Sequence, residues 1–139
     1  MADFKASTAL RDFIANRLTT AGGCYMWATL HSSTAALLAG TVYAATGLDE
    51  LISANGYTAQ GKTCGTITAS AGAIDTPDVV WTTGAGETLT AQCCATWINS
   101  SNTIIGAALV CVKDGPLVAS NTGTMRSTVT NIITIPTPA

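Results

Sequence analysis

The sequence predicts a mainly β domain, an antiparallel β-sandwich or jelly-roll-like fold, with one N-terminal amphipathic α-helix. Three observations support this prediction. Hydrophobic residues recur at clear helical spacing near the N-terminus. From residue 24 onward the pattern changes to a period of two, and Val, Ile, Thr and Trp, which favour strands, become frequent. Turn sequences rich in Gly, Pro, Asn and Asp then separate short segments, as in an all-β domain.

The chain of 139 residues fits one domain with an appended N-terminal element. We divide it into an N-terminal arm and helix, residues 1–23, and a β-sandwich domain, residues 24–139, with an extended, proline-containing C-terminal tail. Pro136 and Pro138 are expected to end the last strand. The tail is either an exposed end or a segment that lies on a neighbouring subunit and adds a strand there.

Residues 7–20 are predicted to form the helix. Its apolar stripe consists of Leu10, Phe13, Ile14 and Leu18, and Phe4 upstream extends the apolar contact. Gly22 and Gly23 are expected to end the helix, because a glycine readily adopts the left-handed conformation found at helix C-termini.

The strands are predicted from alternation and from the turns between them. Residues 24–31 carry apolar side chains on both faces, so this strand is expected to be central or covered by the helix on one side. Residues 32–55 are predicted to be a surface segment with a short helix over 48–54. Further strands are expected at residues 57–63, 65–70, 79–82, 88–99, 103–113, 116–120 and 128–135.

The composition is low in charge. Charged residues make up 10% of the chain and hydrophobic residues 47%, whereas a typical charged share is about 25%. Because interfaces lose charge, this favours a surface that neighbouring proteins cover. The alternative is a low-charge β protein that is soluble by itself.

Several partners are not expected. The net charge is -2 and the basic residues are scattered, so we predict no nucleic-acid binding. No apolar segment follows a basic start, so no signal peptide is predicted. No apolar run approaches the roughly 18 residues of a membrane span, so no membrane partner is expected.

Catalytic and metal sites are also not expected. The five cysteines include no closely spaced ligand pair, which argues against a metal site and favours reduced thiols. Cys93 and Cys94 should point to opposite faces of a strand as small apolar fillers. His31 is the one histidine and is expected to be a hydrogen-bonded strand residue, not a catalytic base. No glycine pattern forms a phosphate cradle, so we predict no cofactor and no enzyme activity.

The three tryptophans, Trp27, Trp81 and Trp97, fall in predicted strands. We expect them to pack in the core or on a sheet face. The alternative places one of them at a subunit interface, where Trp is enriched.

Six short motifs follow the predicted helix in a particular order. They are Tyr25-Met-Trp-Ala-Thr-Leu-His31, Glu50, Gly56-Tyr57-Thr-Ala-Gln60, Asp78-Val-Val-Trp81, Ile104-Ile-Gly-Ala-Ala108 and Gly115-Pro-Leu117. In this order the chain resembles a family of small virion proteins of tailed bacteriophages, described as tail-fibre-like or capsid decoration (cement) proteins. Two loops depart from the family pattern. His31-Ser-Ser-Thr-Ala35 replaces a histidine-threonine-alanine-aspartate stretch, and Gln60-Gly61-Lys62 takes the place of a basic residue expected shortly after the Gly-Tyr pair.

The resemblance implies a β-sandwich that assembles on the virion, commonly as a homotrimer. We expect a decoration protein that is made in the host cytoplasm, binds the major capsid protein on the capsid exterior and stabilises the shell by several weak contacts engaged together. The candidate interface consists of Phe4, Leu10, Phe13, Ile14, Leu18, Ile135 and Pro136. The alternatives are a tail-fibre, baseplate or other tail-associated structural protein, and a host-encoded β-sandwich enzyme.

Overall fold

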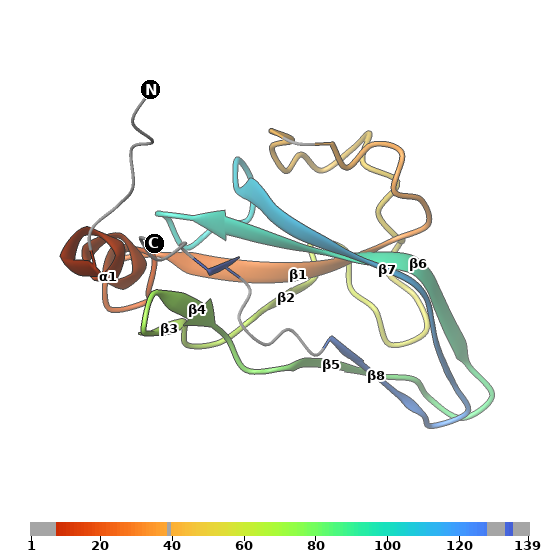
Figure 1. Ribbon diagram of the computed structural model, residues 1–139. Coiled ribbons are helices and arrows are strands. Elements are labelled where there is room, and N and C mark those ends of the chain that lie inside the picture. The colour runs from red at the N-terminus through yellow and green to blue at the C-terminus, as the bar shows by residue number, and fades with distance from the viewer. Residues whose placement is uncertain (1–7, 39, 128–132, 135–139) are drawn as a thin grey trace.

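The computed structural model describes residues 8–38, 40–127 and 133–134. Within these ranges the chain forms one helix and nine strands (Figure 1). In chain order they are α1 (Thr8–Arg17), β1 (Tyr25–His31), β2 (Lys62–Thr63), β3 (Thr68–Ser70), β4 (Ala73–Asp75), β5 (Val79–Thr82), β6 (Thr88–Asn99), β7 (Ala108–Ser120), β8 (Thr124–Ser127) and β9 (Ile133–Thr134).

The strands form three antiparallel sheets. The large sheet has the order β2-β1-β6-β7, and two small sheets have the orders β3-β4-β9 and β5-β8. Figure 1 shows β3, β4, β5 and β8 on one side of the large sheet. The prediction of a mainly β, sandwich-like chain with one N-terminal helix is therefore confirmed.

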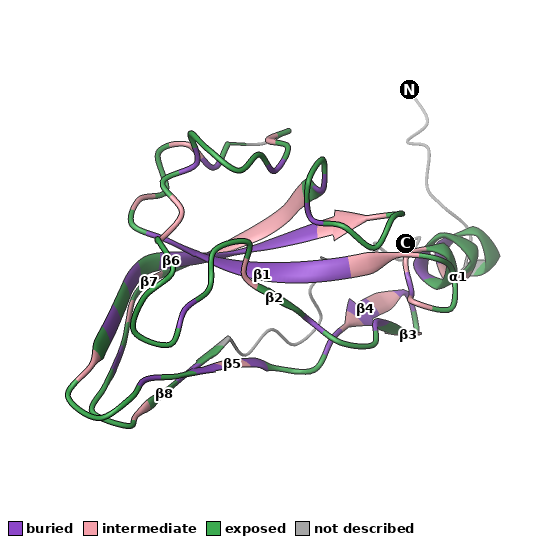
Figure 2. Cartoon of the chain, turned by 180° about the vertical axis from the view of Figure 1, so that it is seen from behind, coloured by how far each residue is buried: buried purple, intermediate pink, exposed green. Residues whose placement is uncertain are grey.

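Both faces of the large sheet are buried along β1 and the second half of β6, and Figure 2 shows β1 buried along most of its length. The lower core fills the space between the large and small sheets. Its large members include Met26, Leu30, Tyr57, Ile74 and Trp81. The upper core lies on the opposite face, under residues of the long segment between β1 and β2 and of the loop before β7. Its members are Trp27, Leu37, Tyr43, Leu48, Cys93, Ala95, Trp97, Ile104 and Ala107.

The strand β1 lies between β2 and β6, so the prediction that it is central is confirmed. The segment from residue 32 to residue 61, here called the excursion, covers one face of β1. The predicted surface segment is thus real, but it is part of the core and not only a surface loop. Its predicted short helix over 48–54 is wrong, because this stretch is irregular. Asp49 has a φ of 55°, which interrupts a helix, and Glu50 forms an antiparallel bridge with His31.

The longest hairpin joins β6 and β7. The two strands predicted at 103–113 and 116–120 are wrong as separate strands, because β7 is continuous. The expected turn at Asp114-Gly115-Pro116 lies inside β7, which runs unbroken from Ala108 to Ser120. A register shift between Ala91 and Cys93 absorbs these residues as a bulge. A Cβ at Gly115 would lie 2.6 Å from the Gln92 backbone oxygen, so glycine permits the close approach.

Other predicted strands are shorter or displaced. The expected strand at 57–63 is reduced to β2, that at 65–70 to β3, and residues 103–107 form a loop over the upper core. Of the strand predicted at 128–135, only Ile133–Thr134 is described, as β9, and the other residues lie outside the described ranges. The strand β8, in which Met125 pairs with Trp81, was not predicted. The small strand β4 was not predicted. The Ala71-Gly72 turn between β3 and β4 is confirmed, with positive φ at both residues.

Candidate functional site

The helix α1 presents an apolar face to solvent. Phe13 is 56% exposed, Leu10 41% and Ile14 38%. Arg11 and Ala15 are instead buried, because α1 packs with this other side against β3 and its turn. The Arg17 guanidinium lies 5.3 Å from the centre of the Phe13 ring and leaves the ring otherwise open. An amphipathic helix normally buries its large apolar side chains, so this orientation marks the exposed face as a candidate interface.

Gly72 explains why α1 docks by the side that carries Arg11. A Cβ at this position would lie 2.5 Å from Arg11 Cδ, and the φ of Gly72 is 76°. The missing side chain lets the Arg11 methylene groups lie directly on the β3–β4 turn. The Arg11 Nε atom is 3.7 Å from Asp12 Oδ1, which places one carboxylate near the buried cation.

The predicted interface residues fall into three groups. Leu10, Phe13 and Ile14 lie together on the exposed face of α1. Leu18 is partly buried and packs against the lower core, so it does not belong to that face. Phe4, Ile135 and Pro136 lie outside the described residues.

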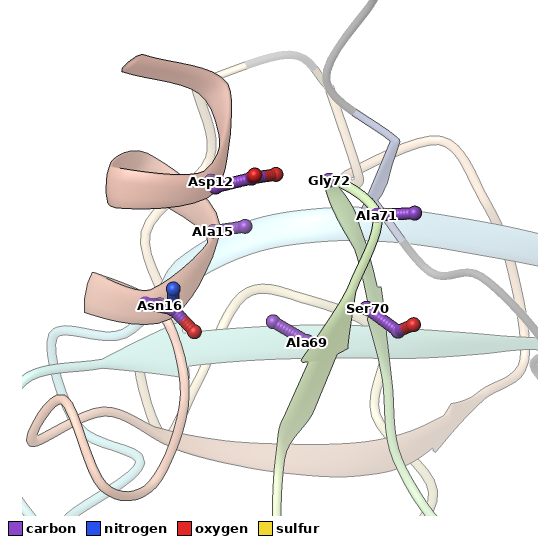
Figure 3. Close-up of a pocket in the computed structure, with 7 residues that line it drawn as sticks. All are labelled: Asp12, Ala15, Asn16, Ala69, Ser70, Ala71 and Gly72. Atoms are coloured by element: carbon purple, nitrogen blue, oxygen red, sulfur yellow. The ribbon is translucent and has the colours of Figure 1, made fainter. Parts of the chain in front are cut away.

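Two recesses flank α1. Figure 3 shows a cleft between α1 and the β3–β4 hairpin, with a volume of about 230 Å³, into which Asp12 and Asn16 project from the helix. A second recess, of about 380 Å³, lies between Phe13 and the turn that carries Ala21 and Gly22. Both are open hollows next to the exposed apolar face, and together they give this end of the molecule an uneven surface.

A chain of hydrogen bonds runs through the upper core. Trp97 Nε1 donates to Thr29 Oγ1 at 2.7 Å, and Thr29 Oγ1 lies 2.7 Å from His31 Nε2. His31 Nδ1 lies 2.8 Å from the Leu48 carbonyl oxygen. A carbonyl can only accept, so Nδ1 carries the proton and donates. In the neutral imidazole, which burial favours, Nε2 then accepts from the Thr29 hydroxyl.

His31 is a structural residue, as expected from the sequence. It is fully buried, and both ring nitrogens have partners. Burial lowers the pKa of His31 below its ordinary value of 6.5, although the hydrogen bond to Leu48 and the charges of Glu50 and Asp49 oppose this. The ring therefore fastens the excursion to β1 through Leu48.

A second polar cluster centres on Glu50. The Tyr57 hydroxyl donates to Glu50 Oε1 at 2.5 Å, the Gln60 backbone N–H donates to the same oxygen at 2.7 Å, and the Tyr43 hydroxyl donates to Oε2. Tyr57 Oη also accepts from the Leu30 backbone N–H at 3.2 Å. Burial, followed by the hydrogen bond to Glu50, raises the pKa of both tyrosines. Glu50 thus connects three points of the excursion to each other and, through Tyr57, to β1.

Sequence reasoning missed the Glu50 cluster. Glu50 was placed near the start of a helix, where acidic side chains are common, and nothing in the spacing singled out its tyrosine partners. A signal did exist: Tyr43 and Tyr57 are buried aromatic residues with hydroxyl groups, and such groups need a polar partner.

The three tryptophans and three of the five cysteines, Cys64, Cys93 and Cys94, are buried core residues. Trp27, Trp81 and Trp97 are buried, which favours the core prediction over the interface alternative. Cys93 lies in the upper core and Cys94 in the lower core, on opposite faces of β6 as predicted. None of the five cysteines forms a disulfide, and burial raises the pKa of the Cys64 thiol to about 12, which makes it a poor nucleophile.

Among residues 8–38, 40–127 and 133–134, no group of three or more His, Cys, Asp or Glu side chains could hold a metal ion. No helix in the described part of the chain has the length and apolar character needed to span a membrane. Comparison with known proteins found no matching family model, no matching curated protein and no matching solved structure.

Proposed function

We propose that this chain is a non-enzymatic structural protein of a tailed-phage virion, which attaches as a homo-oligomer to the outside of the capsid shell and stabilises it. The observation that carries the proposal is the exposed apolar face of α1, here Leu10, Phe13 and Ile14. The low charge of the chain and the ordered motifs that resemble small virion proteins support the same function.

The apolar area of the α1 face is small, so firm attachment needs several copies that bind together. Covering these half-exposed side chains removes on the order of 200 Å² of apolar surface from water. That area corresponds to about 5 kcal/mol. Association costs about 4–15 kcal/mol, so one helix face alone gives weak binding at best. Several copies that engage neighbouring capsid subunits at once attach firmly, because each later contact is intramolecular.

The test places charge on the apolar face. In virions assembled with Phe13→Asp/Ile14→Asp, we expect the number of copies per purified particle, measured by quantitative mass spectrometry, to fall to a small fraction of wild type. The matched control, Thr58→Asp/Thr66→Asp, adds the same charge at two exposed positions outside this face and should keep full occupancy. Far-ultraviolet circular dichroism confirms that both variants fold.

Two outcomes contradict the proposal. Normal occupancy of the Phe13→Asp/Ile14→Asp variant would show that α1 is not the attachment surface. Antibody labelling of wild-type virions at the tail, with none on the shell, would replace the capsid by the tail as the site of attachment.

A further inference from the structure

The outermost strand-like segment of the large sheet lies beyond β7. Val42 forms an antiparallel bridge with Ala108 at the start of β7. The bridge is bracketed by two backbone hydrogen bonds, from Tyr43 N to Ala107 O at 2.8 Å and from Leu109 N to Thr41 O at 3.0 Å. In this pattern the residue between the two bonds directs its own N–H and C=O away from its partner strand. The backbone of Val42 therefore faces outward at the sheet edge.

This edge is open. No described residue forms a hydrogen bond with the Val42 backbone, and its side chain is 54% exposed. Leu38, whose carbonyl accepts from Thr41 N, is 67% exposed, and Ile105, next to the residue that donates to Tyr43 O, is 49% exposed. An edge with free backbone groups and apolar side chains is a template for pairing with another strand.

The two segments that build this edge contain no charged residue. Neither residues 32–48 nor residues 99–112 include an Asp, Glu, Lys or Arg, so all eight acidic and six basic residues lie elsewhere. Charge-free composition is typical of the centre of an interface. A partner surface with unpaired charges would lose their hydration on this face without compensation, so the face suits a partner that is equally uncharged.

The rest of β7 lacks these properties. Lys113 and Asp114 are exposed there, and Pro116, with no N–H, lies at a bulge. Charge, proline and bulges are the features by which natural sheets prevent edge pairing. The contrast leaves residues 40–44, Gly-Thr-Val-Tyr-Ala, as an edge without such protection.

We propose that this edge pairs with the same edge of a second copy of the chain about a two-fold axis. Antiparallel pairing of two identical segments is self-complementary: Val42 N–H of each copy donates to Val42 O of the other, and both large sheets join into one. The uncharged faces around Leu38 and Ile105 then cover each other. This inference deepens the homo-oligomeric part of the proposed function, on which it rests, by naming the surface through which copies meet.

The test uses the backbone N–H of Val42. Val42→Pro removes this N–H without removing a hydrogen bond within the described chain. Val42→Thr keeps the backbone N–H and replaces valine with another β-branched residue. By sedimentation equilibrium of the full chain we expect wild type and Val42→Thr at twice the monomer mass of 14.1 kDa, and Val42→Pro at 14.1 kDa. Near-ultraviolet circular dichroism from the Tyr43–Trp97 ring pair, whose centres are 5.3 Å apart, reports that the excursion stays in place.

A second pair of variants tests the surrounding face. Ile105→Lys places a charge beside the proposed two-fold axis and should give monomers, while Ile52→Lys, at an 81% exposed position outside this face, should remain dimeric. A wild-type chain at 14.1 kDa up to high micromolar concentration, or any oligomer that both Val42→Pro and Ile105→Lys leave intact, overturns the proposal. Failure of the proposed function would instead appear as unchanged virion occupancy, which is a separate measurement.

Discussion

Replacing Glu50 with alanine is expected to loosen the excursion, because three donors lose their acceptor at once. The Tyr43 and Tyr57 hydroxyls and the Gln60 N–H all point at this carboxylate, and both tyrosines are at least 97% buried. A hydrogen bond to a charged group contributes about 1.5–3 kcal/mol. Glu50 is itself partly exposed, so water replaces part of what is lost. We therefore expect the lower end for each bond, about 4–5 kcal/mol in total, out of about 5–15 kcal/mol for a domain.

The assay is urea unfolding, with the free energy of unfolding extrapolated to water. Asp49→Asn is the matched control, because Asn tolerates the positive φ of this exposed neighbour and the change should lie within about 0.5 kcal/mol. Glu50→Gln keeps the shape and one acceptor, so its loss should be intermediate. A Glu50→Ala variant that loses no more than Asp49→Asn would refute the view that this carboxylate holds the excursion.

Two further predictions concern buried positions. Burial lowers the pKa of His31, so below pH 6.5 the unfolded chain binds a proton at this ring more readily than the folded chain does. The free energy of unfolding should therefore fall from pH 7.5 to pH 5. Urea midpoints over this range should fall more steeply for wild type than for His31→Gln, and equal slopes would contradict the assignment of a neutral ring. Gly72→Ala should lose about 2–3 kcal/mol through backbone strain and the clash with Arg11. Gly86→Ala, at a φ of 74° with nothing within 4 Å of the added Cβ, should lose only about 1 kcal/mol by thermal unfolding, and equal losses would exclude the clash.

The strands that sequence reasoning predicted well are those whose neighbours cover both faces evenly. β1 and β6 were located to within a residue or two, because their side chains alternate between the two cores. The alternation also assigned Cys93 and Cys94 to opposite faces. The short strands were less predictable, since β2, β4 and β9 have only two or three residues each and depend on tertiary pairing.

The excursion could not be predicted in detail because its structure depends on side chains that meet only in three dimensions. The local pattern at residues 48–54 favoured a helix, but the hydrogen bonds of Glu50 to Tyr43, Tyr57 and Gln60 impose an irregular path. The same limit applies to the bulge at Gly115, where a local turn signal was overridden by pairing with β6.

The apolar residues of α1 were recognised from spacing, but spacing alone could not assign them to solvent. A helical stripe of Leu, Phe and Ile ordinarily indicates a face buried in the core. Here the small Ala15 and the stem of Arg11 fit the narrow contact with the β3–β4 turn, and the larger Phe13 side chain remains outside. The size of the site against which a helix docks therefore decides which of its faces is buried.

The polar clusters around His31 and Glu50 give the excursion a defined position that apolar packing alone would not. The hydrophobic effect has no direction, and a layer of loops lacks the backbone ladder that aligns one strand with another. Directional hydrogen bonds through Thr29, His31 and Glu50 supply the alignment. They fix the path of the chain on either side of Tyr43, which in turn places Val42 against β7. The outward edge on which self-association is proposed thus depends on buried polar residues that never contact the partner.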